Sequence, residues 1–337
     1  MNIGLIGAGN ISDTHARAAK AIPGVAIAAV HGANTEKAAA LAARYGAAAY
    51  PDLDSFLAHR PMEVVAIGSP SGVHAQQAMA AIARGLHVLV EKPLDIDTTR
   101  IDALVAAAES AHVRVGVFFQ DRLRPAMAEL KQALDGGRLG TPVFASGRVK
   151  WYRPPEYYAQ SRWRGTWALD GGGALMNQGI HTVDLLLWLL GPVARVRAAT
   201  ATQLHAIEVE DTAAAIFEFE SGALGVIEAA TSIYPGYARR LELTGTEGTM
   251  VIEDDRIARI DLRASTSTLA PPPPAAESAG SPVVSDASAH QRIIEDFIHA
   301  VRTGAPLACD AREGRRSVAA VLAIYEAART GAAVTPG

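Results

Sequence analysis

The first 120 residues alternate short apolar runs with Ala-rich helical segments, and this alternation limits the possible fold more than any other feature. The apolar runs have the length of strands and cover residues 2–7, 25–30, 63–69, 87–91 and 114–119. Helical patterns such as "EKAAALAARYG" and "HAQQAMAAIARG" lie between them, each closed by a glycine that suits a left-handed C-cap. Strands that are apolar throughout and joined by helices predict a parallel sheet covered on both faces.

After about residue 140 the pattern changes to strands separated by short turns. The strand-like segments are "TPVFASGRVKWY", "VARVRAATATQL", "TAAAIFEFESGALGVIEAATS" and "RRLELTGTEGTMVIED". Their short connections predict an antiparallel meander. We therefore expect an α/β protein with a doubly wound parallel sheet in residues 1–120. An α+β domain with an open, mostly antiparallel sheet is expected in residues 121–337.

The C-terminal part of the chain contains one low-complexity segment and two further helical patterns. Residues 265–289 include four consecutive prolines at 271–274, which predict an extended surface loop or arm. Two closing helices are expected near residues 290–302 and 312–329, and they could pack back on the first domain.

The composition excludes several classes of partner. A net charge of −4 gives no electrostatic reason to bind nucleic acid or an anionic membrane surface. The single cysteine, Cys309, cannot form an internal disulfide and fits a reducing compartment. The N-terminus lacks the basic region of a signal peptide, and "LLLWLLG" is too short to span a bilayer. We therefore expect a soluble, cytoplasmic protein.

A glycine-rich loop connects the first expected strand to the first expected helix. The stretch "GLIGAGNIS" places Gly7 and Gly9 directly after the strand, with Asn10 and Ile11 opening the helix. In this context the backbone amides and the helix N-terminus can bind the pyrophosphate of a dinucleotide. An ordinary tight turn is the alternative. The four further strands behind the loop favour a Rossmann dinucleotide-binding domain.

The residues after the second strand bear on the type of dinucleotide. NAD-binding domains usually carry an acidic residue about 20 residues after the glycine loop, where it binds the ribose hydroxyls. Here the strand ends in "AAVHGANTEKA", which has no acid between His31 and Asn34. Asn34 and Lys37 could donate to a 2′-phosphate, although Lys37 also suits a solvated helix. The sequence leaves NAD and NADP open and favours NADP.

A lysine follows the fourth expected strand. The segment "VLVEKPLD" places Glu91, Lys92 and Pro93 at the carboxyl end of that strand. Ligands of doubly wound sheets bind at this edge. Lys92 could therefore bind a hydroxyl or carbonyl beside the nicotinamide. A surface lysine in a loop is the alternative.

The stretch "LDGGGALMNQGIHTVDLLLWLLG", residues 169–191, predicts a helix that is apolar nearly all the way round. Asn177, His181 and Asp184 are spaced i, i+4 and i+7 in it and therefore share one face. Burying them is unfavourable unless they are paired or face a ligand. We expect His181 to accept a proton and Asn177 to position the substrate, with a hydrogen-bonded core histidine as the alternative. No third or fourth ligand accompanies His181 and Asp184, so no metal is expected. The preceding glycines are expected to let cofactor or substrate approach closely.

The glycine loop, "EKP" and "GGGALMNQGIHTVD", in this order, resemble the Gfo/Idh/MocA family of nicotinamide-dependent oxidoreductases over nearly the whole chain. The resemblance implies catalysis between the two domains by Lys92 and His181. Asn177 stands where many members have an aspartate, so a strict Asp–His dyad is not expected. The segments 157–193 and "IEVEDT" are similar to the branch of nucleotide-linked N-acetylhexosaminuronate 3-dehydrogenases.

The resemblance also implies roles at other positions. Ser69, Pro70, His74 and Gln120 would lie near the nicotinamide half of the cofactor, together with Glu91 and Lys92. In "RWRGTW", Arg164 with Trp163 or Trp167 suits a polyhydroxylated or anionic substrate. Loop packing and surface charge are the alternative for these residues.

The function implied is oxidation of a secondary hydroxyl of a sugar or sugar derivative, or reduction of the matching ketone. Three alternatives stay open: an inositol or polyol dehydrogenase, an NAD-dependent glycosidase, and a non-catalytic cofactor-binding regulator. A homodimer or homotetramer through the second sheet is also expected. Apolar residues occur there on both faces of one strand, with Ala213, Ala215, Phe217 and Phe219 on one face and Ala214 and Ile216 on the other.

Overall fold

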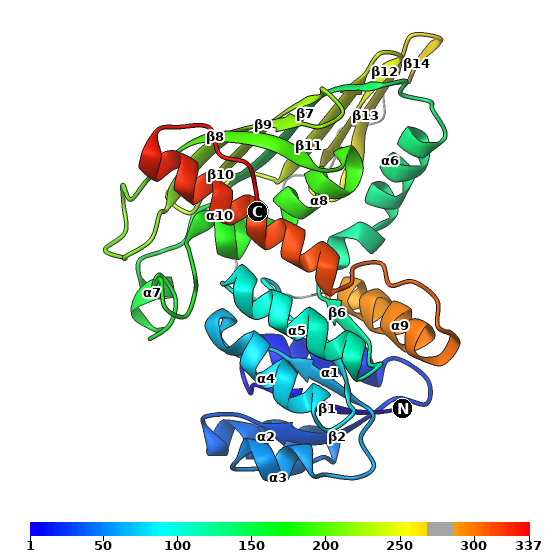
Figure 1. The fold of residues 1–337 in the computed structure, drawn as a ribbon, viewed down its shortest axis with the longest axis vertical. Helices are drawn as coiled ribbons and strands as arrows, with labels where there is room; N and C mark the ends of the chain where they lie inside the picture. The colour runs from blue at the N-terminus through cyan, green and yellow to red at the C-terminus, as the bar shows by residue number, and fades with distance from the viewer. Residues whose placement is uncertain (268–285) are drawn as a thin grey trace. The chain divides into compact units, whose positions relative to one another are not determined.

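The computed structural model describes residues 1–267 and 286–337, which form two compact units. The first unit contains Met1–Gln120 and the described part of Val283–Arg315. The second contains the described part of Asp121–Pro282 and Arg316–Gly337. Figure 1 shows the chain in sequence colours. The proline arm expected at residues 271–274 lies outside the described residues.

The first unit is built on a sheet of six parallel strands in the order β3-β2-β1-β4-β5-β6. Because the order reverses at β1, the crossovers before and after it lie on opposite faces, which confirms the doubly wound prediction. The sequence pattern missed β3, since it has only three residues and two of them are alanines, which also suit a helix. The strands are β1 (Asn2–Ile6), β2 (Ala26–His31), β3 (Ala48–Tyr50), β4 (Val64–Ile67), β5 (His87–Val90) and β6 (Val115–Val117).

The helices of the first unit begin and end at residues that suit these positions. The Asn34 side chain accepts a hydrogen bond from the Lys37 amide at the start of α2, and Gly46 ends that helix with a φ of 68°. Helix α9 comes from the C-terminal part of the chain, yet it packs against α1 and β5. The helices are α1 (Asn10–Lys20), α2 (Thr35–Tyr45), α3 (Leu53–Leu57), α4 (His74–Ile82), α5 (Thr98–Ser110) and α9 (Ser288–Thr303), with a 3-10 turn at Ser71–Val73.

The second unit is built on an eight-stranded sheet in the order β14-β13-β12-β11-β7-β10-β9-β8. The predicted open, mostly antiparallel sheet is confirmed, but the simple meander is wrong. Strand β7 lies between β10 and β11 and pairs in parallel with β10. The strands are β7 (Pro142–Lys150), β8 (Val193–Ala201), β9 (Thr212–Phe219), β10 (Leu224–Ala230), β11 (Arg240–Gly245), β12 (Gly248–Glu253), β13 (Arg256–Leu262) and β14 (Ser265–Ser267).

Helix α8 (Ile180–Leu190) packs on one face of this sheet, against β7 and β10. A Cβ atom at Gly147 would lie 2.4 Å from Thr182, so the glycine permits this close approach. The opposite face of the sheet exposes Phe144, Ile216 and Leu224 to 37%, 48% and 45%. The other helices assigned to or reaching this unit are α6 (Pro125–Asp135), α7 (Glu156–Ala159) and α10 (Ala311–Thr330), with a 3-10 turn at Gln120–Leu123. Among the described helices, none is both long and apolar enough to cross a membrane.

Candidate active site

The glycine loop has the conformation that an anion site requires. Gly7 has a φ of 110°, and a Cβ atom there would lie 2.6 Å from the Gly68 carbonyl oxygen, so only glycine fits. Gly9, which has no side chain to cap the helix, precedes α1, and both Gly9 and Asn10 are exposed. Ile11 is half-buried in the first turn. The first N–H groups of α1 can therefore bind a phosphate.

The two residues considered for a 2′-phosphate lie at the start of α2. The carbonyl oxygen of the Asn34 side chain accepts the Lys37 amide N–H at 2.9 Å. This leaves the amide nitrogen of Asn34 as the group able to donate to a ligand. Lys37 and Asn34 are both exposed beyond the end of β2. The His31 ring lies 3.1 Å from the Tyr50 carbonyl oxygen.

His74 connects the loops that follow β4 and β5. Its Nε2 atom lies 2.8 Å from the carbonyl oxygen of Ser69, and its Nδ1 atom lies 2.8 Å from that of Pro93. The ring is buried and contacts one carbonyl oxygen of each loop, so it holds the two loops together. The Ser69 hydroxyl donates to Gln77 at 2.6 Å, and Pro70 precedes the 3-10 turn.

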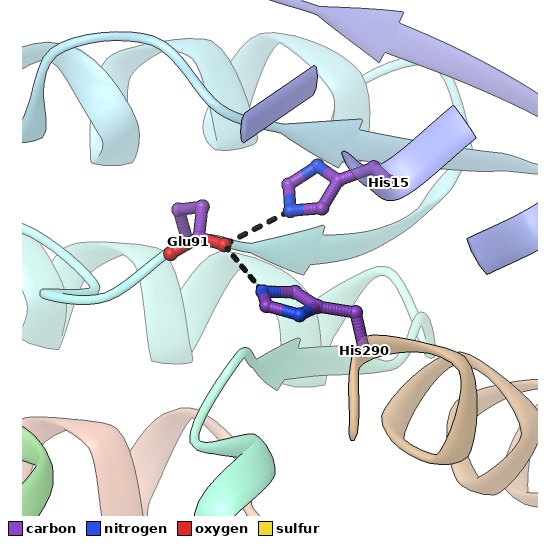
Figure 2. Close-up of side chains that lie close together, drawn as sticks. All are labelled: His15, Glu91 and His290. Atoms are coloured by element: carbon purple, nitrogen blue, oxygen red, sulfur yellow. Dashed lines mark hydrogen bonds and ion pairs between the residues drawn. The ribbon is translucent and has the colours of Figure 1, made fainter. Parts of the chain in front are cut away.

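Glu91 turns into the interior of the first unit. Its Oε1 atom lies 2.9 Å from His15 Nε2 and 3.7 Å from His290 Nε2 (Figure 2). Burial by itself would raise the pKa of the Glu91 carboxyl, but the hydrogen bonds and charges of the two histidines hold this pKa well below its ordinary value. Lys92 is half-buried and is followed by a cis peptide bond to Pro93. Gln120 is buried at the end of the unit.

In the second unit, the helix expected over residues 169–191 is interrupted. A π-helical segment, Ala174–Gly179, precedes α8 and contains Asn177, whereas His181 and Asp184 lie in α8 itself. The α-helical spacing expected for these three residues is therefore wrong for Asn177, which lies in the π-helical segment. The Asn177 side chain donates to Asp170 at 2.9 Å.

Asp184 has a structural role. Its carboxylate accepts two hydrogen bonds from Arg122, at 2.7 and 2.8 Å, and one from the Ser317 hydroxyl at 2.9 Å. It is fully buried, whereas Asn177 and His181 are half-buried. In this arrangement the Asp184 carboxylate neutralises a buried guanidinium.

His181 has a carboxylate neighbour that sequence reasoning missed. Its Nδ1 atom lies 3.7 Å from Asp121 Oδ2, and Arg124 and Arg239 form ion pairs with the same carboxylate. Burial alone would raise the pKa of Asp121, but the charges of Arg239, His181 and Arg124 hold it well below its ordinary value. Asp121 is therefore ionised at neutral pH. Asn177 carries no charge, whereas Asp121 places near His181 a negative charge that it shares with Arg124 and Arg239.

Two of the three glycines before the π-helical segment, Gly172 and Gly173, are explained by internal packing. A Cβ atom at Gly172 would lie 2.1 Å from the Tyr325 hydroxyl, and one at Gly173 would lie 1.7 Å from the Glu210 carbonyl oxygen. The Glu210 carboxylate accepts the N–H groups of Gly173 and Leu175. The expected approach of a ligand is not needed to explain these glycines.

Two arginines stack on aromatic rings in the second unit. The Arg164 guanidinium lies 4.4 Å from the Tyr157 ring centroid and 5.2 Å from that of Trp163. Arg153 lies 5.6 Å from the Tyr157 centroid. Gln178, which follows Asn177, donates to the Tyr157 hydroxyl at 3.4 Å. Trp167 instead packs edge-on against Tyr325, so of the two tryptophans only Trp163 stacks on Arg164.

Known proteins are similar to this chain over nearly its whole length. A model described as "Oxidoreductase family, NAD-binding Rossmann fold" matches residues 1–119, and one described as "GFO/IDH/MocA C-terminal domain" matches residues 127–251. The UDP-N-acetylglucosamine 3-dehydrogenase of Acidithiobacillus ferrooxidans is 30% identical over 96% of this chain and 96% of its own. The D-apiose dehydrogenase of Paraburkholderia graminis is 28% identical over 98% and 88%.

A solved structure gives the same result. The WlbA dehydrogenase from Bordetella pertussis, in complex with NADH and UDP-GlcNAcA, matches with a TM-score of 0.87 and 33% identity. The match covers 99% of this chain and 98% of that one. The glycine loop, the lysine at the end of β5 and the histidine of α8 all lie within the matched length. The chain belongs to the GFO/IDH/MocA family of oxidoreductases.

Proposed function

We propose that this protein is a nicotinamide-dependent dehydrogenase that oxidises a secondary hydroxyl of a sugar or sugar derivative, or reduces the matching ketone. The observation that carries the proposal is the pairing of His181, in α8, with the ionised Asp121, in the 3-10 turn Gln120–Leu123. A carboxylate beside one ring nitrogen favours the protonated imidazole and so makes the other nitrogen a better base.

In the proposed reaction, His181 Nε2 takes the hydroxyl proton because Nδ1 faces Asp121. Asn177 orients the substrate, and Asp170 fixes the amide by accepting its hydrogen bond. Nicotinamide, when bound, would accept the hydride from the substrate carbon that bears this hydroxyl. Lys92, at the carboxyl end of β5, stabilises the developing alkoxide or relays its proton.

We further propose that the substrate is anionic. Arg153 and Arg164 both stack on Tyr157, and the charge of Arg164 contributes to lowering the pKa of Arg153, after the larger effect of burial. A phosphate or carboxylate between these guanidinium groups would relieve their repulsion and accept paired hydrogen bonds. The uronate nucleotide in the Bordetella pertussis complex supports this substrate class.

For the cofactor, we propose that NADP is accepted as well as NAD. The family description and the NADH complex support NAD. The exposed Asn34 and Lys37, with no acid between His31 and Asn34, support tolerance of a 2′-phosphate. We place the reaction in the cytoplasm, in keeping with the single cysteine, Cys309, which is buried and forms no internal disulfide.

We also propose a homodimer or homotetramer in which the exposed faces of two second-unit sheets pack together. Ala213, Ala215, Phe217 and Phe219 are buried on the helix-covered face, as the alternating pattern predicts. Ile216 is exposed on the other face and is joined there by Phe144 and Leu224 from the neighbouring part of the sheet. A second copy would remove these side chains from water.

A nicotinamide absorbance screen tests the substrate class. Free sugars, inositols, glycosides and nucleotide sugars are each offered with NAD and with NADP. We expect turnover of an anionic sugar derivative, with Arg164→Ala raising its KM. Turnover of neutral sugars or inositols alone would refute the anionic substrate, and release of a free sugar without net cofactor reduction would indicate a glycosidase.

A further inference from the structure

Three buried polar side chains meet in the first unit, outside the groups that the proposed reaction uses. His15 comes from α1, Glu91 from the residue after β5, and His290 from α9 (Figure 2). They are exposed to only 1%, 7% and 2%, and their facing ligand atoms lie within 4.8 Å of one another. Burying three such groups is unfavourable unless they stabilise one another.

The charges of this cluster follow from its contacts. Glu91 is ionised at neutral pH because the histidines hold its pKa low against the effect of burial. Burial lowers the pKa of His15, so its imidazole is neutral there. A carboxylate can only accept hydrogen bonds, so His15 Nε2 must carry the proton and donate it to Glu91 Oε1, 2.9 Å away.

The cluster is connected to Lys92 through the second carboxylate oxygen. Glu91 Oε2 accepts the backbone N–H of Lys92 at 3.1 Å. Phe118 stacks on the His15 ring with a centroid distance of 4.1 Å and an interplanar angle of 7°, which fixes the ring. One oxygen of the Glu91 carboxylate faces the histidines and the other accepts the backbone N–H of Lys92. The orientation of this carboxylate therefore affects the position of the Lys92 backbone.

Two imidazoles and one carboxylate can also bind a metal ion. Histidine ligands of metals usually donate their other N–H to an acceptor. In the described part of the chain, the Nδ1 atoms of His15 and His290 are buried and have no hydrogen-bond partner. The 2.9 Å contact between His15 and Glu91 is moreover an ordinary hydrogen-bond distance. The geometry therefore favours a polar cluster over a metal site, with a hydrogen bond from His15 to Glu91 and a 3.7 Å contact between His290 and Glu91.

We propose that His15 and His290 are positioning residues that act through Glu91 to hold Lys92 in the orientation that turnover requires. This rests on the proposed function, in which Lys92 acts on the substrate hydroxyl. Neither histidine touches the substrate in this account. Their loss should change the turnover number more than the binding of either ligand.

The kinetic test compares two replacements of His290. His290→Met removes the polar group, whereas His290→Gln keeps an N–H that can donate to Glu91. We expect His290→Met to lower kcat about tenfold, which corresponds to ~1.4 kcal/mol, while KM for the sugar and Kd for the cofactor change by less than about twofold. His290→Gln should restore most of the loss. Ile298→Ala, a buried apolar change on the same helix, controls for general destabilisation.

A second readout does not depend on turnover. Hydrogen exchange of the Lys92 amide, which donates to Glu91, is measured by mass spectrometry in the same variants. We expect faster exchange in His290→Met than in the wild type, His290→Gln and Ile298→Ala. The wild type could reduce no cofactor with any sugar while the Lys92 amide still exchanged faster in His290→Met. The proposed function would then fail, but the positioning of Lys92 by the histidines and Glu91 would be supported.

Three results would overturn the proposal. The first is an unchanged Lys92 exchange rate in His290→Met. The second, if the wild type is active, is faster exchange of the Lys92 amide in His290→Met together with an unaltered kcat. The third is one equivalent of a transition metal in the purified wild type that His290→Met loses, because the cluster would then be a metal site.

Discussion

Asp184 binds the Arg122 guanidinium at two points, with Oδ2 2.8 Å from Nε and Oδ1 2.7 Å from Nη2, and both side chains are buried. Removing one charge would leave the other without compensation. We expect Asp184→Asn to destabilise the protein by about 3–5 kcal/mol, with little change in turnover per folded molecule. Denaturant unfolding measures this. Asp102→Asn, in the exposed pair with Arg315, is the control and should leave the unfolding midpoint unchanged. Equal effects in the two variants would contradict the structural role of Asp184.

If Lys92 and His181 are catalytic, their removal should lower turnover without weakening cofactor binding. Lys92→Ala and His181→Ala should each lower kcat by about 10²–10⁴-fold, as expected for loss of a general acid or base. Cofactor titration should give nearly unchanged affinity, because the glycine loop remains intact. Near-normal turnover in either variant would remove that residue from the mechanism.

Glu210 makes stability depend on pH in a defined direction. Burial raises the pKa of its carboxyl to about 7 from an ordinary 4.5. Between these values the folded state keeps a proton that the unfolded state releases, so the free energy of unfolding falls as pH rises from about 4.5 to about 7. Relative to Glu210→Gln, the wild type should lose on the order of 2–3 kcal/mol over this range. Denaturation of both proteins at each end of the range measures the difference, and parallel pH curves would contradict it.

Local sequence patterns predicted the strands and helices better than their pairing. The alternation in residues 1–120 gave the doubly wound sheet, although three-residue β3 was too short to detect. The insertion of β7 between β10 and β11 joins strands far apart in sequence, which no local pattern encodes. Similarly, the partners of His181 and Asp184 lie about 60 residues earlier in the chain, at Asp121 and Arg122.

The glycine run shows that residue type alone does not reveal what glycines pack against. Glycines can make room for a ligand or for close internal packing, and the fold shows that Glu210 and Tyr325 pack against Gly173 and Gly172. The π-helical segment was missed for a related reason. Its sequence, "ALMNQG", has no feature that distinguishes it from the first turns of α8.

Cofactor choice is tested by Lys37→Ala. If Lys37 donates to a 2′-phosphate, the variant should weaken NADP binding by up to about tenfold, ~1.4 kcal/mol, and leave NAD binding unchanged. Calorimetric titration of both cofactors into wild type and variant decides it. A wild type that binds NAD at least tenfold more tightly than NADP would contradict dual use.

Assembly is tested on the exposed sheet face. Ile216→Arg places a charge on the sheet face proposed as the interface and should shift the mass found by light scattering toward that of the monomer. Leu204→Arg changes an equally exposed apolar residue outside the sheet and should leave the mass unchanged. A monomeric wild type at micromolar concentration would refute the interface.

The most direct test of the central claim is transfer of deuterium from the substrate to the cofactor. A sugar identified by the absorbance screen is labelled on the carbon that bears the oxidised hydroxyl, and the reduced nicotinamide is examined by mass spectrometry. The account predicts one deuterium in the reduced cofactor and a keto-sugar product in equal amount, with both lost in His181→Ala. Failure of every sugar class to reduce NAD or NADP, or reduced cofactor without deuterium, would contradict it.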